Sequence, residues 1–126
     1  VKRATTPEEL AAMSKVKSWG RKYDPQLLQH DTLYPLYIEA EGQVLAGGLM
    51  MVFEELDAID VEDVFVVEDQ QGKGWGRVLM GQMLYLGKKA GLEACSLIAF
   101  AESQEFYHKI GFETLAELKF MQAKKR

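Results

Sequence analysis

The sequence has one cysteine, no long apolar run and no excess of basic residues. Cys95 alone cannot form an intramolecular disulfide or a cysteine-based metal cluster, and His30 and His108 lie too far apart to suggest a metal site. No stretch approaches the roughly 18 apolar residues of a membrane helix. With 15 Lys and Arg against 19 Asp and Glu, the net charge of −4 argues against a nucleic-acid partner.

The N-terminal segment also lacks the apolar stretch that a signal peptide needs. The chain begins at Val1 rather than at a methionine, so we expect that its start was processed or trimmed. Lys2 and Arg3 lead into threonines and a proline. We therefore expect neither a signal peptide nor a membrane span, and we expect a cytoplasmic location.

What is present is an ordinary globular composition: 126 residues, of which 48% are hydrophobic and 27% are charged. This length predicts a single domain over residues 1–126. A chain of this size buries about two-thirds of its unfolded surface, so its core needs no disulfide or metal. Cys95 lies in an apolar run, which favours a buried, unreactive thiol over a Cys–His nucleophile pair.

Periodicity predicts a mixed sheet flanked by helices, which is an α/β fold (α+β in some schemes). Thr6, Pro7 and Glu9 form a capping-box helix start, and the glycines at 47–48 indicate a bulge or a close backbone approach inside a strand. The expected helices begin near Thr6, Asp24, Gly74 and Ser103, and the expected strands cover residues 1–4, 36–40, 44–53, 59–67, 95–100, 112–114 and 118–121.

The most informative segment follows a strand and opens a helix with glycines at alternate positions. Such glycines let backbone N–H groups turn toward one point, and the helix start adds free N–H groups and a partial positive charge. We therefore predict a cradle for phosphate or pyrophosphate. The residues of this segment are Gln71, Gly72, Lys73, Gly74, Trp75, Gly76 and Arg77.

The spacing excludes two familiar phosphate loops. A Walker A loop needs Ser or Thr after its Gly-Lys pair, but here Gly74 follows Lys73. A dinucleotide fingerprint needs a third glycine where Arg77 stands. The alternative without a ligand is a glycine-rich helix cap, which would weaken the helix start for no visible packing reason.

Three segments together resemble the GCN5-related N-acetyltransferase (GNAT) superfamily. Gln71-x-x-Gly74-x-Gly76 resembles its acetyl-CoA pyrophosphate loop. Residues 61–66, Val-Glu-Asp-Val-Phe-Val, are similar to the Leu-Glu-Asp-Leu-Tyr-Val strand of polyamine and glucosamine-phosphate acetyltransferases. Residues 106–112, Phe-Tyr-His-Lys-Ile-Gly-Phe, are similar to the family's Phe-Tyr-x-Lys-x-Gly-Phe segment. The resemblance implies an acyl-CoA N-acyltransferase fold with a mostly antiparallel sheet, acetyl-CoA as the acetyl donor, a primary amine as the acceptor, and no metal.

The chemistry that the resemblance implies needs a base, because an amine of pKa about 10 is mostly protonated at neutral pH. Glu62 and Asp63 are the candidates. Since neighbours in a strand point to opposite faces, we expect only one of them to face the site. The resemblance favours Glu62, and the alternative for each is a solvent-facing or salt-bridged carboxylate.

The resemblance also assigns a donor for the thioester carbonyl: the backbone N–H of Val66, where the family's strand bulges. It pairs the pantetheine arm with Val66 and Val67, whose side chains can equally belong to the core. Tyr107 is the candidate acid for the departing thiolate, and its alternative is a ring that only packs. No residue suggests a covalent nucleophile, so we expect direct transfer in a ternary complex.

The acceptor is expected to be a small-molecule or peptide amine. Aromatic residues of the N-terminal half can wall it or belong to the core; they are Trp19, Tyr23, Tyr34 and Tyr37. Two other functions stay open: a non-catalytic acyl-CoA sensor or regulatory module, and a protein-interaction domain with a vestigial cradle. A homodimer also stays open.

Overall fold

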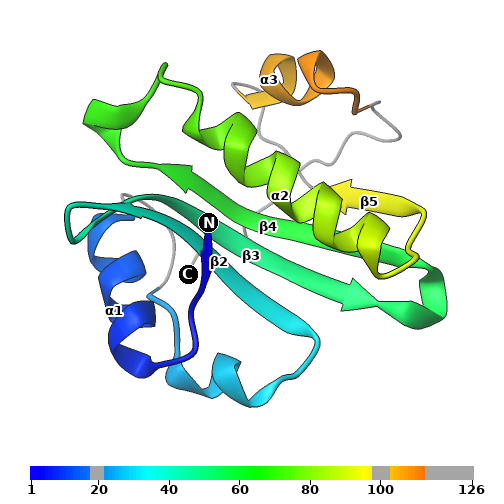
Figure 1. Ribbon diagram of the computed structural model, residues 1–126, viewed down its shortest axis with the longest axis horizontal. Coiled ribbons are helices and arrows are strands. Elements are labelled where there is room, and N and C mark those ends of the chain that lie inside the picture. The colour runs from blue at the N-terminus through cyan, green and yellow to red at the C-terminus, as the bar shows by residue number, and fades with distance from the viewer. Residues whose placement is uncertain (18–21, 98–102, 113–126) are drawn as a thin grey trace, which may run out of the picture.

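The computed structural model describes residues 1–17, 22–97 and 103–112, which form a five-stranded sheet with helices on both faces (Figure 1). The strands lie across the sheet in chain order: β1 (Lys2–Arg3), β2 (Leu33–Ala40), β3 (Gln43–Phe53), β4 (Ala58–Val66) and β5 (Ala94–Leu97). The helices are α1 (Pro7–Val16), α2 (Trp75–Lys89) and α3 (Gln104–Lys109). Short 3₁₀ turns are η1 (Pro25–Gln29), η2 (Glu54–Leu56) and η3 (Glu68–Gln70).

The predicted fold class is confirmed. Only β4 and β5, which α2 connects, run parallel, and the other neighbouring strands of the described sheet are antiparallel. The end of the strand expected over 95–100 and the strands expected beyond Phe112 lie outside the described residues. Within the described ranges, no helix combines the length and the apolar character needed to cross a bilayer.

Two apolar clusters hold the helices to the two faces of the sheet. On one face, α2 contributes Leu79, Met80 and Met83, and on the other face α1 contributes Leu10 and Met13. Each of these five side chains is at most 1% exposed. Since burying one such side chain stabilises a fold by about 1.5–3 kcal/mol, apolar burial is what places both helices on the sheet.

The local signals at the N-terminal helix are confirmed. Pro7 is the first residue of α1, and the Thr6 hydroxyl accepts a hydrogen bond from the Glu9 N–H at 3.2 Å. The Glu9 carboxylate in turn accepts from the Thr5 N–H at 3.1 Å, which completes the cap. At α3 the position was right but the cap was wrong: Ser103 precedes the helix without a capping side-chain bond.

β4 carries a bulge opposite the glycine pair of β3. Glu62 is opposite Leu49 and Phe65 is opposite Gly47, so two residues of β4 lie between these pairs where β3 has one. Asp63 has a φ of 56°, the left-handed conformation that a non-glycine residue rarely adopts. The extra residue is therefore in β4.

The bulge changes which face each side chain occupies. Val61 packs in the cluster under α2, but Phe65, four residues on, packs in the cluster under α1. Regular alternation would put both on one face. Gly48 allows the bulge to come close, since a Cβ there would lie 3.2 Å from the Val64 Cα. The expected close approach at the glycine pair is thus confirmed.

Candidate active site

Three segments that are distant in the sequence meet at the start of α2. A Cβ placed on Gly76 would lie 3.3 Å from Cζ of Phe106 on α3 and 3.7 Å from Cγ2 of Val66 on β4. Packing therefore explains why residue 76 is a glycine, and the sequence alone did not reveal this reason. Each of the three segments carries one of the motifs that resemble the acetyltransferase family, so the fold brings all three motifs together.

The glycine-rich turn places two glycines with positive φ before the start of α2. Gly72 and Gly74 have φ values of 81° and 88°, and a Cβ on either would meet no atom within 4 Å. Gly74 is the N-cap of α2, and no side chain caps this helix. The first helical hydrogen bond joins the Val78 N–H to the Gly74 carbonyl at 3.1 Å, so the preceding N–H groups lie before the helical ladder.

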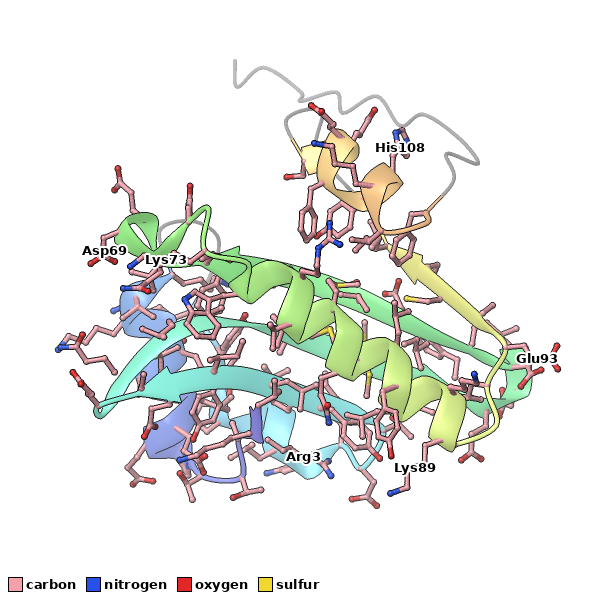
Figure 2. The ribbon with its side chains drawn as sticks, turned by 45° about the horizontal axis from the view of Figure 1, so that its top comes forward. Arg3, Asp69, Lys73, Lys89, Glu93 and His108 are labelled. Atoms are coloured by element: carbon pink, nitrogen blue, oxygen red, sulfur yellow. The ribbon has the colours of Figure 1, made fainter. Side chains whose placement is uncertain are left out.

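Side chains around the turn hold it in place without filling it. The Trp75 indole N–H donates to Oε1 of Gln70 at 3.2 Å, and Lys73 Nζ lies 3.5 Å from the same oxygen. Lys73 and Arg77 are exposed, and Figure 2 shows Lys73 beside Asp69 at the turn. The open space, the N–H groups and the two cations suit a phosphate group.

The end of β4 presents backbone groups on the side away from β3. The Val67 N–H donates to the Leu45 carbonyl of β3 at 2.9 Å. Because N–H directions alternate along a strand, the N–H and the carbonyl of Val66 point the opposite way. The Val66 carbonyl accepts from Nε2 of Gln71 at 3.2 Å. Gln71, a predicted cofactor-binding residue, thus touches the strand edge as well as the turn.

The two candidate carboxylates lie on the same face of the sheet, so the expectation that they point to opposite faces was wrong. Glu62 is opposite Leu49, which packs under α1, and Asp63 Oδ2 accepts from Nζ of Lys17 at the end of α1 at 2.9 Å. The physical reason is the bulge, which puts two successive residues on one side of β4.

The surroundings of the two carboxylates differ. Glu62 is exposed to solvent, and its partial burial raises the pKa of its carboxyl group. The neighbouring Asp60 carboxylate raises this pKa further, through its negative charge and through a hydrogen bond. Asp60 itself accepts from the Ser96 hydroxyl of β5 at 3.1 Å. Asp63 is instead paired with an ammonium that is nearly inaccessible to water. Glu62 is therefore the carboxylate that is free of an ion pair with Lys17.

Tyr107 is a half-buried residue of α3. Its ring packs edge-on against Phe106 and Phe112, with centroids 5.1 Å and 5.8 Å away. Burial and the nearby Cys95 raise the pKa of Tyr107, so its hydroxyl keeps its proton at neutral pH. Burial and the Asp60 charge raise the pKa of Cys95 to about 11, which agrees with the expected unreactive thiol. His108 is exposed on the outer side of α3 (Figure 2).

Two of the three candidate aromatic residues in the described part of the N-terminal half belong to the core. Tyr37 is 4% exposed and donates to Oε2 of Glu9 at 2.5 Å, and Tyr23 is 9% exposed. Tyr34 is half-buried under the Arg3 guanidinium, 3.9 Å from its ring centre. Trp19 lies outside the described residues. The residue that the sequence analysis missed is Lys17: a lysine at a helix end gives no signal that it is buried.

Comparisons with known proteins agree with this geometry. A family model described as an acetyltransferase (GNAT) domain matches residues 32–114. The uncharacterized N-acetyltransferase CgeE of Bacillus subtilis (strain 168) is 27% identical over 77 residues, which is 60% of this chain and 30% of that protein. The uncharacterized N-acetyltransferase MJ1207 of Methanocaldococcus jannaschii is 26% identical over 107 residues, 79% of this chain and 47% of that protein. The chain thus spans less than half the length of either relative.

A solved structure shows the same fold. AAC(6')-Iy, in complex with the bisubstrate analogue CoA-S-monomethyl-acetylneamine, superposes with a TM-score of 0.77 at 17% identity, covering 98% of this chain and 97% of that one. The family model covers more than half of the sequence, from β2 to α3. The chain therefore belongs to the GNAT acetyltransferase family.

Proposed function

We propose that this chain is an acetyl-CoA-dependent N-acetyltransferase that moves an acetyl group to a primary amine within a ternary complex. The observation that carries the proposal is the contact of Gly76 with Val66 and Phe106. Through it the helix start, the strand edge and the α3 segment share one location. Any one of these features has other uses, but acetyl transfer from coenzyme A uses all three.

In this proposal the backbone does most of the binding. The N–H groups of the turn at 72–77 bind the pyrophosphate, with Lys73 and Arg77 adding positive charge. The bound acetyl-CoA supplies an activated thioester carbonyl. The Val66 N–H, which points away from β3, donates a hydrogen bond to that carbonyl, and Val66 and Val67 pair with the pantetheine arm. Gln71 releases the Val66 carbonyl when the arm occupies this edge.

Two side chains move protons. Glu62 accepts the proton of the acceptor ammonium, directly or through water. Its raised pKa makes it a stronger base than an ordinary glutamate. Tyr107 gives its proton to the leaving thiolate, and the phenolate then takes up the second proton that the acetylated nitrogen must lose to become an amide. Its raised pKa keeps the phenol protonated, so it is ready to donate.

The acceptor class follows from charge and from the fold neighbour. Asp60 and Glu62 put two carboxylates on the face of β4 that also carries Asp63, which favours a cationic amine. AAC(6')-Iy, an aminoglycoside N-acetyltransferase, has been solved in complex with the bisubstrate analogue CoA-S-monomethyl-acetylneamine. We therefore propose a small-molecule amine in preference to a peptide amine.

The test is acetyl transfer by the purified protein with acetyl-CoA and a broad panel of amines, read by free thiol formation. We expect thiol release with at least one amine, and intersecting initial-rate lines because both substrates bind before transfer. Parallel lines would contradict direct transfer. Coenzyme A binding by calorimetry without turnover on any amine would favour the sensor, and no binding would favour an interaction domain.

A further inference from the structure

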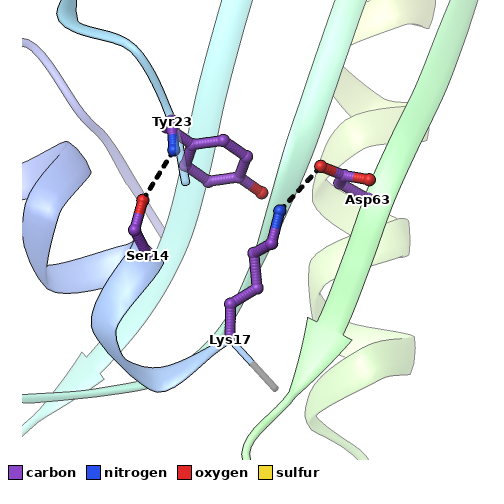
Figure 3. Close-up of polar contacts among 4 residues, drawn as sticks. All are labelled: Ser14, Lys17, Tyr23 and Asp63. Carbon is purple, nitrogen blue, oxygen red and sulfur yellow. Dashed lines mark hydrogen bonds and ion pairs between the residues drawn. The ribbon is translucent and has the colours of Figure 1, made fainter. Parts of the chain in front are cut away.

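Lys17, the first residue after α1, has a side chain that is only 2% exposed. Its Nζ donates to Oδ2 of Asp63 at 2.9 Å and lies 4.3 Å from the centre of the Tyr23 ring. Figure 3 shows the ammonium between the ring and the carboxylate. Because a buried ammonium is strongly unfavourable unless it is paired, the Asp63 carboxylate stabilises Lys17 in this position.

The carboxylate that pairs with Lys17 belongs to the bulge of β4. Asp63 has the positive φ of 56° and is 46 residues away from Lys17 in the sequence. Residues with a side chain adopt this backbone conformation infrequently, although aspartate tolerates it better than most, and contacts around the residue stabilise it. The ion pair is such a contact, since it fixes where the Asp63 side chain must point. It thereby ties the end of α1 to the bulge.

The bulge decides which way the backbone groups of Val66 point. Side chains and N–H groups both alternate along a strand, so one residue more or less reverses every direction beyond that residue. With the bulge, Val67 donates to Leu45 of β3 and Val66 faces away from β3. Without it, the Val66 N–H would turn toward β3.

We propose that Lys17 is a positioning residue for acetyl transfer: its ion pair with Asp63 holds the β4 bulge that aims the Val66 amide away from β3. This inference rests on the proposed function, in which that amide binds the thioester carbonyl. It also gives Asp63 a structural role, so the two adjacent carboxylates have different functions. Asp63 holds the strand, and Glu62 contacts the acceptor.

The first test is Lys17→Met, compared with wild type in turnover and in coenzyme A affinity. We expect kcat to fall by about 10-fold or more, because the amide loses its alignment. Coenzyme A affinity should fall by a smaller factor than kcat, because the pyrophosphate turn is a separate segment and only the pairing of the pantetheine arm with Val66 is disturbed. Lys15→Met is the matched control: Lys15 is exposed on α1 and should leave both quantities unchanged. Turnover of folded Lys17→Met within threefold of wild type would overturn the proposal.

A pair of double variants separates positioning from general stability. Lys17→Met with Asp63→Gly removes both charges and supplies a residue that adopts positive φ readily, so the bulge can persist. Lys17→Met with Asp63→Ala removes the same charges but opposes that conformation. We expect the glycine double variant to recover most of the wild-type kcat and the alanine double variant to stay slow. Equal turnover of the two would overturn the proposal, even if Lys17→Met alone does not fold.

An amide readout keeps this inference distinct from the proposed function. The ¹H–¹⁵N resonances of Val64 and Val66 should shift in Lys17→Met and return toward wild type in the glycine double variant. This measurement needs no acceptor and no turnover. A wild-type protein without transferase activity would therefore refute the function while these shifts still decide whether Lys17 holds the bulge. Unchanged Val66 resonances in Lys17→Met would overturn the inference alone.

Discussion

The glycine-rich turn and the β4 bulge lie on either side of Val66 and reach positive φ by opposite means. The turn uses Gly72 and Gly74, which are exposed and need no side-chain support. The bulge uses Asp63, whose side chain is tied to a buried lysine. A ligand must approach the turn closely, so residues without a side chain are favourable there. The bulge must be rigid, so a residue whose side chain can form an ion pair is favourable there.

The first prediction tests the turn. Gly74→Val should weaken coenzyme A binding by about 100-fold, which is about 2.7 kcal/mol, because valine opposes the positive φ and its side chain enters the open space. Calorimetric titration measures this. Gly81→Ala is the control, since Gly81 is exposed on α2 with no atom within 4 Å of a Cβ. It should bind normally and gain up to about 1 kcal/mol in stability. Normal binding by folded Gly74→Val would remove the turn from the site.

The next prediction tests whether Glu62 acts as the base while Asp63 holds the strand. Glu62→Gln should lower kcat by about 10³-fold, since it removes the base, and leave coenzyme A affinity intact. In wild type, kcat at saturating substrates should fall as pH drops through the Glu62 pKa. Because that pKa is raised, the fall begins at a higher pH than an ordinary glutamate would give. Glu62→Gln should not show this decrease of kcat at low pH.

The stability of Glu62→Gln is the control for its loss of activity. A folded-state pKa above the unfolded value means that the folded protein holds the proton more tightly, so this group's contribution to stability declines as pH rises through that window. Glu62→Gln should therefore be no less stable than wild type at neutral pH in a denaturant titration. A fully active Glu62→Gln with a slow, folded Asp63→Asn would show that the base is Asp63.

A smaller effect tests whether α3 contributes a side chain as well as packing. Tyr107→Phe keeps the edge-on ring contacts with Phe106 and Phe112 and removes only the hydroxyl. We expect turnover to fall by about 10²-fold with coenzyme A affinity changed by less than about 1.5 kcal/mol. Steady-state kinetics and a melting curve measure both. A variant within threefold of wild type would leave Tyr107 a packing residue.

The turn could be predicted from the sequence because its physics is local. Glycines at 72 and 74, followed by a helix, are sufficient to indicate positive φ and free N–H groups. The capping box at Thr6 and Glu9 was predictable for the same reason. In such segments the residues that decide the structure are neighbours in the chain.

The bulge could not be placed in the same way. The bulge requires a change in the phase of the apolar alternation between Val61 and Val64, but residues 64–67 are all apolar, so the pattern beyond Asp63 fits either phase. Two consecutive carboxylates in a strand hide that change, because either can be read as outward-facing. The partner that decides the matter, Lys17, lies 46 residues away and reads as an ordinary solvated helix end.

The smallest effects compare two buried tyrosines near α1. Tyr37 donates to the Glu9 carboxylate at 2.5 Å, and burial together with this bond raises the pKa of Tyr37 to about 12. Tyr37→Phe should cost about 1.5 kcal/mol of unfolding free energy, as expected for a bond to a charged acceptor. Chemical denaturation at neutral pH measures this, and an unchanged midpoint would contradict it.

Tyr23 is the opposite case. Among the described residues its buried hydroxyl has no hydrogen-bond partner, while its ring lies against the Lys17 ammonium. Tyr23→Phe keeps the ring and removes an unpaired polar group, whose burial is unfavourable. We therefore expect the unfolding free energy to change by less than about 1 kcal/mol, toward greater stability. The Lys17–Asp63 pair should persist, so turnover should match wild type. A loss of more than about 1 kcal/mol would mean that the hydroxyl pairs with Asp63 in solution and that the anchor of the bulge includes three residues.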